Sequence, residues 1–175
     1  MTQLGEALRP DALLELTVVA AFGRPALTAE RFVADPWSGR PGARMYRTGD
    51  LARFDGEHLF VVGRCKELII RSGFNVYPAE VEAVLNAHPD VTQSAVVGRA
   101  VEGNEEVVAF VQPVPGRTLS LGDLHTFAAH SLAPYKRPAE IVILHALPAS
   151  AAGKILKSRL VMIAAQSRGK TADGA

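Results

Sequence analysis

Cysteine is nearly absent from this chain, which has Cys65 alone among 175 residues. A single thiol excludes a disulfide framework and a cysteine-rich metal site, and it fits a reducing compartment. Long apolar runs are also missing. The apolar stretch near the start, 12–22, contains Glu15 and is far shorter than the ~20 apolar residues that cross a membrane. No clear cleavage site follows it, so we expect a cytoplasmic protein with no membrane partner.

Neither sign of charge is in excess. Nineteen basic and 18 acidic residues give a formal net charge of +1, whereas nucleic-acid-binding domains usually show a strong basic bias. We therefore expect no nucleic-acid partner. The composition, 48% hydrophobic and 21% charged, is that of a globular protein. The histidines lack the spacing of metal ligands, so no metal bound by the chain itself is expected; they are His58, His88, His125, His130 and His145.

Residues 1–45 lack the regular patterns of the rest of the chain. An apolar segment at 13–19 is compatible with either a strand or a buried helix. Thr28 is placed to cap a short helix through Phe32, and 35–42 is a loop by its proline and glycine content. We therefore expect this region to be a piece of a larger structure.

The remaining residues predict an α+β domain with an antiparallel sheet, a hairpin and flanking helices. Pro78 opens one helix and Ser120 caps another. Gly73 lies in the bend of a hairpin. The predicted strands are 59–62, 67–71, 75–77, 94–98, 107–112 and 141–144, with a loop at 102–106, and a last helix should bury Leu156, Leu160 and Ile163.

Gly153-Lys154 is the first candidate for chemistry. A Walker-type loop needs glycine five residues before Gly153 and Ser or Thr after the lysine, but Pro148 and Ile155 stand there. What remains is one lysine at the start of a helix, after a flexible loop, and an ammonium group suits phosphate oxygens. Taken alone, a solvated surface lysine is the commoner interpretation.

Four motifs occur in one order, and together they resemble the adenylate-forming superfamily: acyl- and aryl-CoA synthetases, peptide-synthetase adenylation domains and firefly luciferase. They are YRTGDL at 46–51, GRCKELIIRSGFNVYPAEVE at 63–82, LAPYKRP at 132–138 and LPASAAGKILK at 147–157. The resemblance covers about 23–162 and implies the fold of the small C-terminal domain of these ligases.

The resemblance also implies a two-step reaction. A carboxylic-acid substrate and ATP give an acyl-adenylate, and the thiol of CoA or of a phosphopantetheine carrier protein then displaces AMP. Mg²⁺, the phosphate loop and the acid pocket belong to the large N-terminal AMP-binding domain of such enzymes. We expect that domain as a partner, in trans or in a parent protein, because 1–45 contains no phosphate loop. The small domain rotates between the two steps.

Residue roles implied by the resemblance fall on five positions. Lys154 corresponds to the catalytic lysine that reaches the α-phosphate in the first step. Asp50 corresponds to the carboxylate that binds both ribose hydroxyls, and Arg64 to the arginine near the ribose. Lys66 takes the hinge position, and Gly73 lies in the loop that faces the active site during thioester formation. Each has a plainer alternative as a surface charge, a turn residue or a hairpin glycine.

We predict three segments from this pattern: 1–65 with a remnant of the large domain, 66–166 as the C-terminal catalytic lid, and a disordered tail at 167–175. Subfamily signals are mixed between CoA ligases and adenylation domains, with CoA ligases slightly favoured. Two functions stay open. The chain is part of an acid–thiol ligase that is incomplete alone, or it is a non-catalytic module that keeps the fold and binds a partner.

Overall fold

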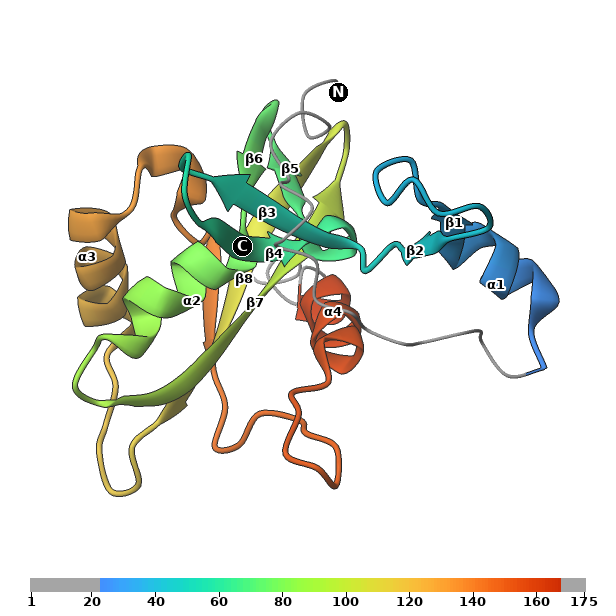
Figure 1. The fold of residues 1–175 in the computed structure, drawn as a ribbon. Helices are drawn as coiled ribbons and strands as arrows, with labels where there is room; N and C mark the ends of the chain where they lie inside the picture. Colours follow the sequence, from blue (N-terminus) through green and yellow to red (C-terminus); the bar gives the residue numbers. More distant parts are fainter. Residues whose placement is uncertain (1–22, 168–175) are drawn as a thin grey trace. The chain divides into compact units, whose positions relative to one another are not determined.

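A computed structural model describes residues 23–167 (Figure 1). The chain divides into two compact units between Val61 and Val62. The boundary predicted after Cys65 stays a prediction and falls inside a short 3₁₀ helix, η2 (Cys65–Glu67). The predicted apolar segment at 13–19 and the tail from 168 lie outside the described residues.

The first unit contains a short helix followed by small two-stranded sheets. β1 and β2 pair antiparallel, with Val33 opposite Met45, and β3 pairs with β4. Strand β4 continues past the division between the units. The elements are α1 (Pro25–Arg31), β1 (Phe32–Ala34), β2 (Arg44–Tyr46), β3 (Asp50–Phe54) and β4 (Leu59–Arg64).

The start of α1 differs from the prediction. Thr28 does not cap the helix, because the helix already begins at Pro25, and the Thr28 hydroxyl donates a hydrogen bond of 2.9 Å to the Arg24 carbonyl. Proline is favoured at the first helical position, where an N–H has no intrahelical partner. The helix therefore begins at its proline.

The predicted hairpin of the second unit is confirmed, with a tighter turn. Strands β5 (Ile69–Arg71) and β6 (Phe74–Val76) pair antiparallel, with Arg71 opposite Phe74. Ser72 and Gly73 both have positive φ, 50° and 81°, as the common two-residue hairpin turn requires. Ser72 holds this conformation while its amide donates a 2.6 Å hydrogen bond to Asn104 Oδ1.

The central sheet contains strands longer than predicted. After α2 (Pro78–Asn86), strands β7 (Val91–Val101) and β8 (Asn104–Pro113) pair along nearly their whole length. The predicted loop at 102–106 was therefore too long. Two of its acidic residues lie in β8, where Glu106 binds Arg99 and Glu105 accepts a hydrogen bond from the Ile70 amide.

Strand β9 (Glu140–Ile143) pairs parallel to β8, so the three-stranded sheet in the order β7-β8-β9 is mixed rather than purely antiparallel. Its crossover contains α3 (Leu121–Ser131) and η3 (Pro134–Lys136). Parallel neighbours need such a connection. The predicted Ser120 cap is confirmed, because its hydroxyl accepts a hydrogen bond from the Asp123 amide at 3.4 Å.

Helices cover both faces of this sheet (Figure 1). Val107, Ala109 and Val111 belong to the apolar cluster that includes residues of α2 and α3. Val108 and Phe110 belong to a second cluster with α4 (Lys157–Ser167). Successive strand residues point to opposite faces, so burial on both sides explains the unbroken apolar run at 107–111.

The predicted apolar face of α4 is confirmed at Leu160 and wrong at Ile163, and Leu156 lies before the first residue of the helix. Leu160 and Ala164 are fully buried one turn apart, whereas Ile163 is 37% exposed. Ser167, which the sequence predicts to begin a disordered tail, is the last residue of this helix.

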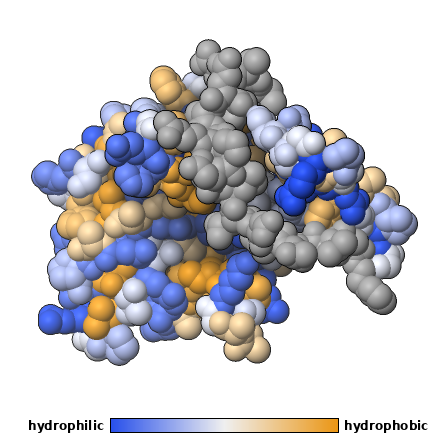
Figure 2. Space-filling view, viewed as in Figure 1, coloured by the Kyte–Doolittle hydropathy of each residue, from blue (hydrophilic) through white to orange (hydrophobic). Residues whose placement is uncertain are grey.

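On the face of the second unit seen in Figure 2, hydrophobic residues form small groups separated by hydrophilic side chains. Within residues 23–167, every helix is too short or too polar to cross a membrane.

Candidate functional site

Lys154 lies on a compact turn between β9 and α4. The Ser150 amide donates to the Lys154 carbonyl at 2.8 Å, and the Lys154 amide donates to Ser150 Oγ at 3.3 Å. Gly153 supplies the positive φ of 76° that closes the turn. These bonds replace the flexible loop expected from the sequence, and the lysine precedes the first residue of α4 by three positions.

The Lys154 side chain is exposed, and within residues 23–167 its ammonium group takes part in no hydrogen bond or ion pair. A backbone fixed by hydrogen bonds with a side chain free to extend can present a positive charge to a ligand outside this domain.

Lys157 is in the opposite situation. Its ammonium lies 2.7 Å from Glu67 Oε2 and 2.9 Å from Glu82 Oε1, and only 25% of its side chain is exposed. Burial acts to lower the pKa of Lys157, but its hydrogen bonds with the two carboxylates outweigh burial, and the net pKa is raised from 10.5. Lys157 is therefore neutralised within the domain, where it joins residues of different elements.

The predicted hinge lies next to this cluster. Lys66 is exposed in η2, immediately before Glu67. Through Glu67 and Lys157, the hinge segment is joined to the helix that follows the Lys154 turn. Sequence reasoning missed this connection, because the partners are 90 residues apart and nothing local distinguishes the paired lysine of the Gly153 motif from the exposed one.

Gly73 is exposed at the tip of the β5–β6 hairpin. The end of β5 next to the turn is fixed to the loop before β9, because Arg71 donates a 2.6 Å hydrogen bond to the Arg137 carbonyl. Phe74 stacks on Tyr135 with ring centroids 4.6 Å apart. The hairpin is therefore anchored on both sides of its turn.

Arg64 and Asp50 lie on either side of the division between the two units. Arg64 ends β4 in the second unit, and Asp50 begins β3 in the first. Both side chains are exposed, and the Asp50 amide donates to Thr48 Oγ1 at 3.0 Å. Thus Arg64, Lys66, Gly73 and Lys154 share one unit, and Asp50 belongs to the other.

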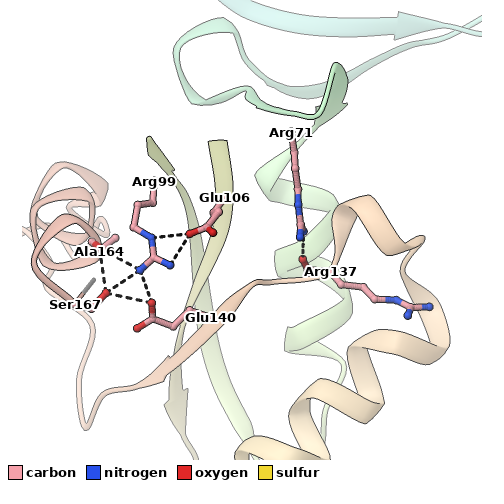
Figure 3. A network of polar contacts seen from close by, with 7 residues as sticks. All are labelled: Arg71, Arg99, Glu106, Arg137, Glu140, Ala164 and Ser167. Carbon is pink, nitrogen blue, oxygen red and sulfur yellow. Dashed lines mark hydrogen bonds and ion pairs between the residues drawn. The ribbon is translucent and has the colours of Figure 1, made fainter. Parts of the chain in front are cut away.

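A second charged group was not anticipated from the sequence (Figure 3). The Arg99 guanidinium, 9% exposed, binds Glu106 at 2.7 Å and also binds Glu140. It donates a further hydrogen bond of 3.0 Å to Ser167 Oγ at the end of α4. This group links all three strands of the sheet to the last helix. Because these contacts all lie within the domain, the role we assign to Arg99 is structural.

No part of residues 23–167 brings together three His, Cys, Asp or Glu side chains able to hold a metal ion. The predicted site residues among the described residues are therefore cations, one carboxylate and a glycine turn, without a metal-ligand set.

Comparison with known proteins decides the family. Residues 80–154 match the family model of the AMP-binding enzyme C-terminal domain. The chain is 38% identical over 169 residues to an indoleacetate–CoA ligase of Aromatoleum aromaticum, with 93% of this chain covered. The chain belongs to the adenylate-forming superfamily. It carries the C-terminal domain of these enzymes, and the α+β fold expected from the sequence is confirmed.

Relatives in the superfamily include both subfamilies suggested by the motifs. A dimodular nonribosomal peptide synthase of Bacillus subtilis is 41% identical over 142 residues, or 79% of this chain and 6% of the synthase. Among solved structures, the o-succinylbenzoate CoA synthetase of Bacillus subtilis in complex with its acyl-adenylate has a TM-score of 0.70 at 33% identity.

These relatives are much longer than the similar region. The chain spans 32% of the length of the indoleacetate–CoA ligase, and the match covers 81% of this chain and 28% of the o-succinylbenzoate synthetase. The similarity therefore concerns their C-terminal part.

Proposed function

We propose that this chain is the mobile C-terminal lid of an AMP-forming acid–thiol ligase. In this role it adds catalytic groups to an active site formed by a large AMP-binding domain, in the same polypeptide or a separate one. The overall reaction activates a carboxylic acid with ATP and transfers the acyl group to the thiol of CoA or of a phosphopantetheine carrier. Relatives named as CoA ligases and as a fatty acid–[acyl-carrier-protein] ligase support this reaction class.

The geometry of Lys154 carries the proposal. Its ammonium group is exposed on a hydrogen-bonded turn, while the neighbouring Lys157 is neutralised by carboxylates. An ammonium held at the α-phosphate would stabilise the negative charge that develops as the carboxylate attacks phosphorus and pyrophosphate leaves. A lysine already paired within its own domain could not serve in this way.

The other four predicted residues receive roles that fit their positions. We assign the Asp50 carboxylate to the two ribose hydroxyls, because two acceptor oxygens match a vicinal diol. Arg64, exposed at the end of β4, is assigned to the ribose side of the same nucleotide. Lys66 is the hinge. Gly73, which has no side chain, allows the backbone of the turn to approach the thiol in the second step.

Mg²⁺ would accompany ATP and neutralise phosphate charge. Because the described residues contain no metal-ligand set, we assign its binding to the large domain together with the nucleotide, and this chain's contribution to phosphate charge rests on Lys154.

The experiment is a comparison of the two half-reactions. The chain is mixed with the large domain of a related ligase, ATP and a panel of carboxylic acids, and pyrophosphate release is followed. Lys154→Ala should slow acyl-adenylate formation by about 10²–10³-fold, the usual effect of removing one group that stabilises transition-state charge. Thioester formation from supplied acyl-adenylate should change little.

The matched control is Arg159→Ala, which removes another exposed cation close to the Lys154 turn and should leave both half-reactions intact. Equal losses in both half-reactions for Lys154→Ala would contradict the catalytic role. Tight association with a large domain without any turnover would instead favour a non-catalytic, partner-binding module.

A further inference from the structure

We propose that Lys157 is a positioning residue that locks the downstream end of the hinge to the body of the lid. The inference rests on the proposed function for the meaning of the hinge at Lys66. It assigns a task to a lysine that does not meet the substrate.

The contacts of Lys157 link the hinge to three elements of the domain. Glu67, the last residue of η2, and Glu82 of α2 both bind the Lys157 ammonium at the start of α4. Glu82 Oε1 also accepts a 2.8 Å hydrogen bond from the Val96 amide on β7. The hinge is thus connected through one ammonium group to two helices and the edge strand of the sheet.

The surroundings show why this link matters. An open cavity of about 260 Å³ lies between the hinge segment, β7 and the first turns of α4. Its lining includes Lys66, Glu67, Leu68, Val97 and Val161. Since a cavity separates these side chains on one side, close packing alone does not hold the hinge segment there. Glu67 supplies the polar connection, ahead of fully buried Ile69.

The charges around Lys157 determine what happens when the connection is broken. One lysine lies between two carboxylates, so removing its ammonium leaves Glu67 and Glu82 facing each other as like charges. Loss of one partner from a partly buried group of this kind is unfavourable because the remaining charges are uncompensated. The hinge end would then be repelled from α2 rather than held beside it.

The same lock connects the hinge to the catalytic turn. Leu156, directly before Lys157, donates a 2.8 Å hydrogen bond to the Pro148 carbonyl and closes the base of the Lys154 turn. Rotation at Lys66 is therefore transmitted through Glu67 and Lys157 to the turn that presents Lys154. Without the lock, part of the rotation would be lost in local movement of the hinge segment.

The single cysteine provides a direct test. Cys65 is exposed in η2, so a nitroxide spin label attached there reports the mobility of the hinge segment in the full chain. In Lys157→Ala we expect the rotational correlation time of the label to fall by about twofold or more, since side-chain motion on the nanosecond scale is no longer restrained. Lys157→Arg, which keeps the positive charge, should give the same spectrum as the parent chain.

A matched ion pair elsewhere in the domain provides the control. Lys136 binds Glu80 at 2.5 Å, and its side chain is 24% exposed, almost the same as Lys157. Lys136→Ala should leave the label unchanged. The proposal is overturned if the two alanine variants have the same effect, or if neither changes the label.

Glu67→Ala keeps the proposal testable should Lys157→Ala fail to fold. This variant leaves the Lys157–Glu82 pair in place and removes only the connection to the hinge, so the label should again become mobile. An unchanged label in a folded Glu67→Ala chain overturns the proposal. These spectra need no ligase activity, so a mobile label in a chain that supports no turnover would reject the proposed function alone.

Kinetics add a second readout where the chain supports adenylation with a large domain. Lys157→Ala should lower kcat about tenfold with little change in the KM for ATP, because the reacting groups are present but less well placed. Lys157→Arg should recover kcat.

Discussion

The positively charged side chains near the two ends of helix α4 have opposite environments. Before its N-terminal end, Lys154 is exposed on a tight turn and its ammonium binds nothing within residues 23–167. At its C-terminal end, Arg99 is buried and binds Glu106, Glu140 and Ser167 (Figure 3). The comparison contrasts a cation that we propose acts in catalysis with one that stabilises the fold, and it can be tested by removing cations one at a time.

Arg99→Met should have the largest effect on stability. The substitution keeps an apolar side chain but leaves Glu106 and Glu140 without their shared partner. Removing one member of a buried charged group typically costs about 3–5 kcal/mol. Urea unfolding of the chain, followed by circular dichroism, measures the loss. A loss as small as that of an exposed lysine would break the distinction between the two ends of α4.

Lys157→Met should have the next largest effect, about 1–2 kcal/mol, since its side chain is 25% exposed and solvent weakens its two ion pairs. The same unfolding assay applies, with Lys157→Arg as the control that retains the charge.

The pH dependence of that difference gives a third prediction. The pKa of Lys157 is raised above 10.5 in the folded chain by its carboxylate partners, against the effect of burial. The stability from Lys157 is therefore fully present below pH 10.5 and is lost as the pH rises through the higher folded pKa. The gap between the parent and Lys157→Met should stay constant from neutral pH to about pH 9 and narrow above 10.5. A gap that is constant into strong alkali would contradict this assignment.

Lys136→Ala should cost less than about 1 kcal/mol, because Lys136 has one ion pair where Lys157 has two, and its partner Glu80 is 41% exposed. Its unfolding midpoint should lie between those of the Lys157 and Lys154 variants.

Lys154→Met should have the smallest effect on stability, within about 0.5 kcal/mol of the parent, as for most surface substitutions. The same variant is expected to have the largest effect on adenylation. A marked loss of stability would show that Lys154 serves the fold, and the contrast drawn above would then be wrong.

Much of the fold could be predicted because local signals and packing agree. Pro78 starts a helix and Ser120 caps one, as their chemistry favours. The length of β7 and β8 could not be predicted from polarity, because Glu105 and Glu106 are polar residues that find partners on other elements. The parallel pairing of β9 depends on a crossover whose direction no local pattern encodes.

The candidate site, too, could be predicted only in part. Its five residues were identified from motifs, and their roles remain predictions. The pairing of Lys157 with Glu67 and Glu82 was not foreseen, because ion pairs between distant segments depend on how the helices meet. Burial of Ala164 rather than Ile163 has the same origin, since the contact surface of α4 is set by the sheet beneath it.

The parallel pairing of β9 with β8 has a consequence for the order of assembly. β7 and β8 are joined by a two-residue turn at Glu102–Gly103, so this ribbon can form early from local contacts. β9 must wait until α3 has crossed over, since pairing of distant segments is slow. We therefore expect Lys154 to reach its place late in folding, when the ribbon that supports α4 already exists.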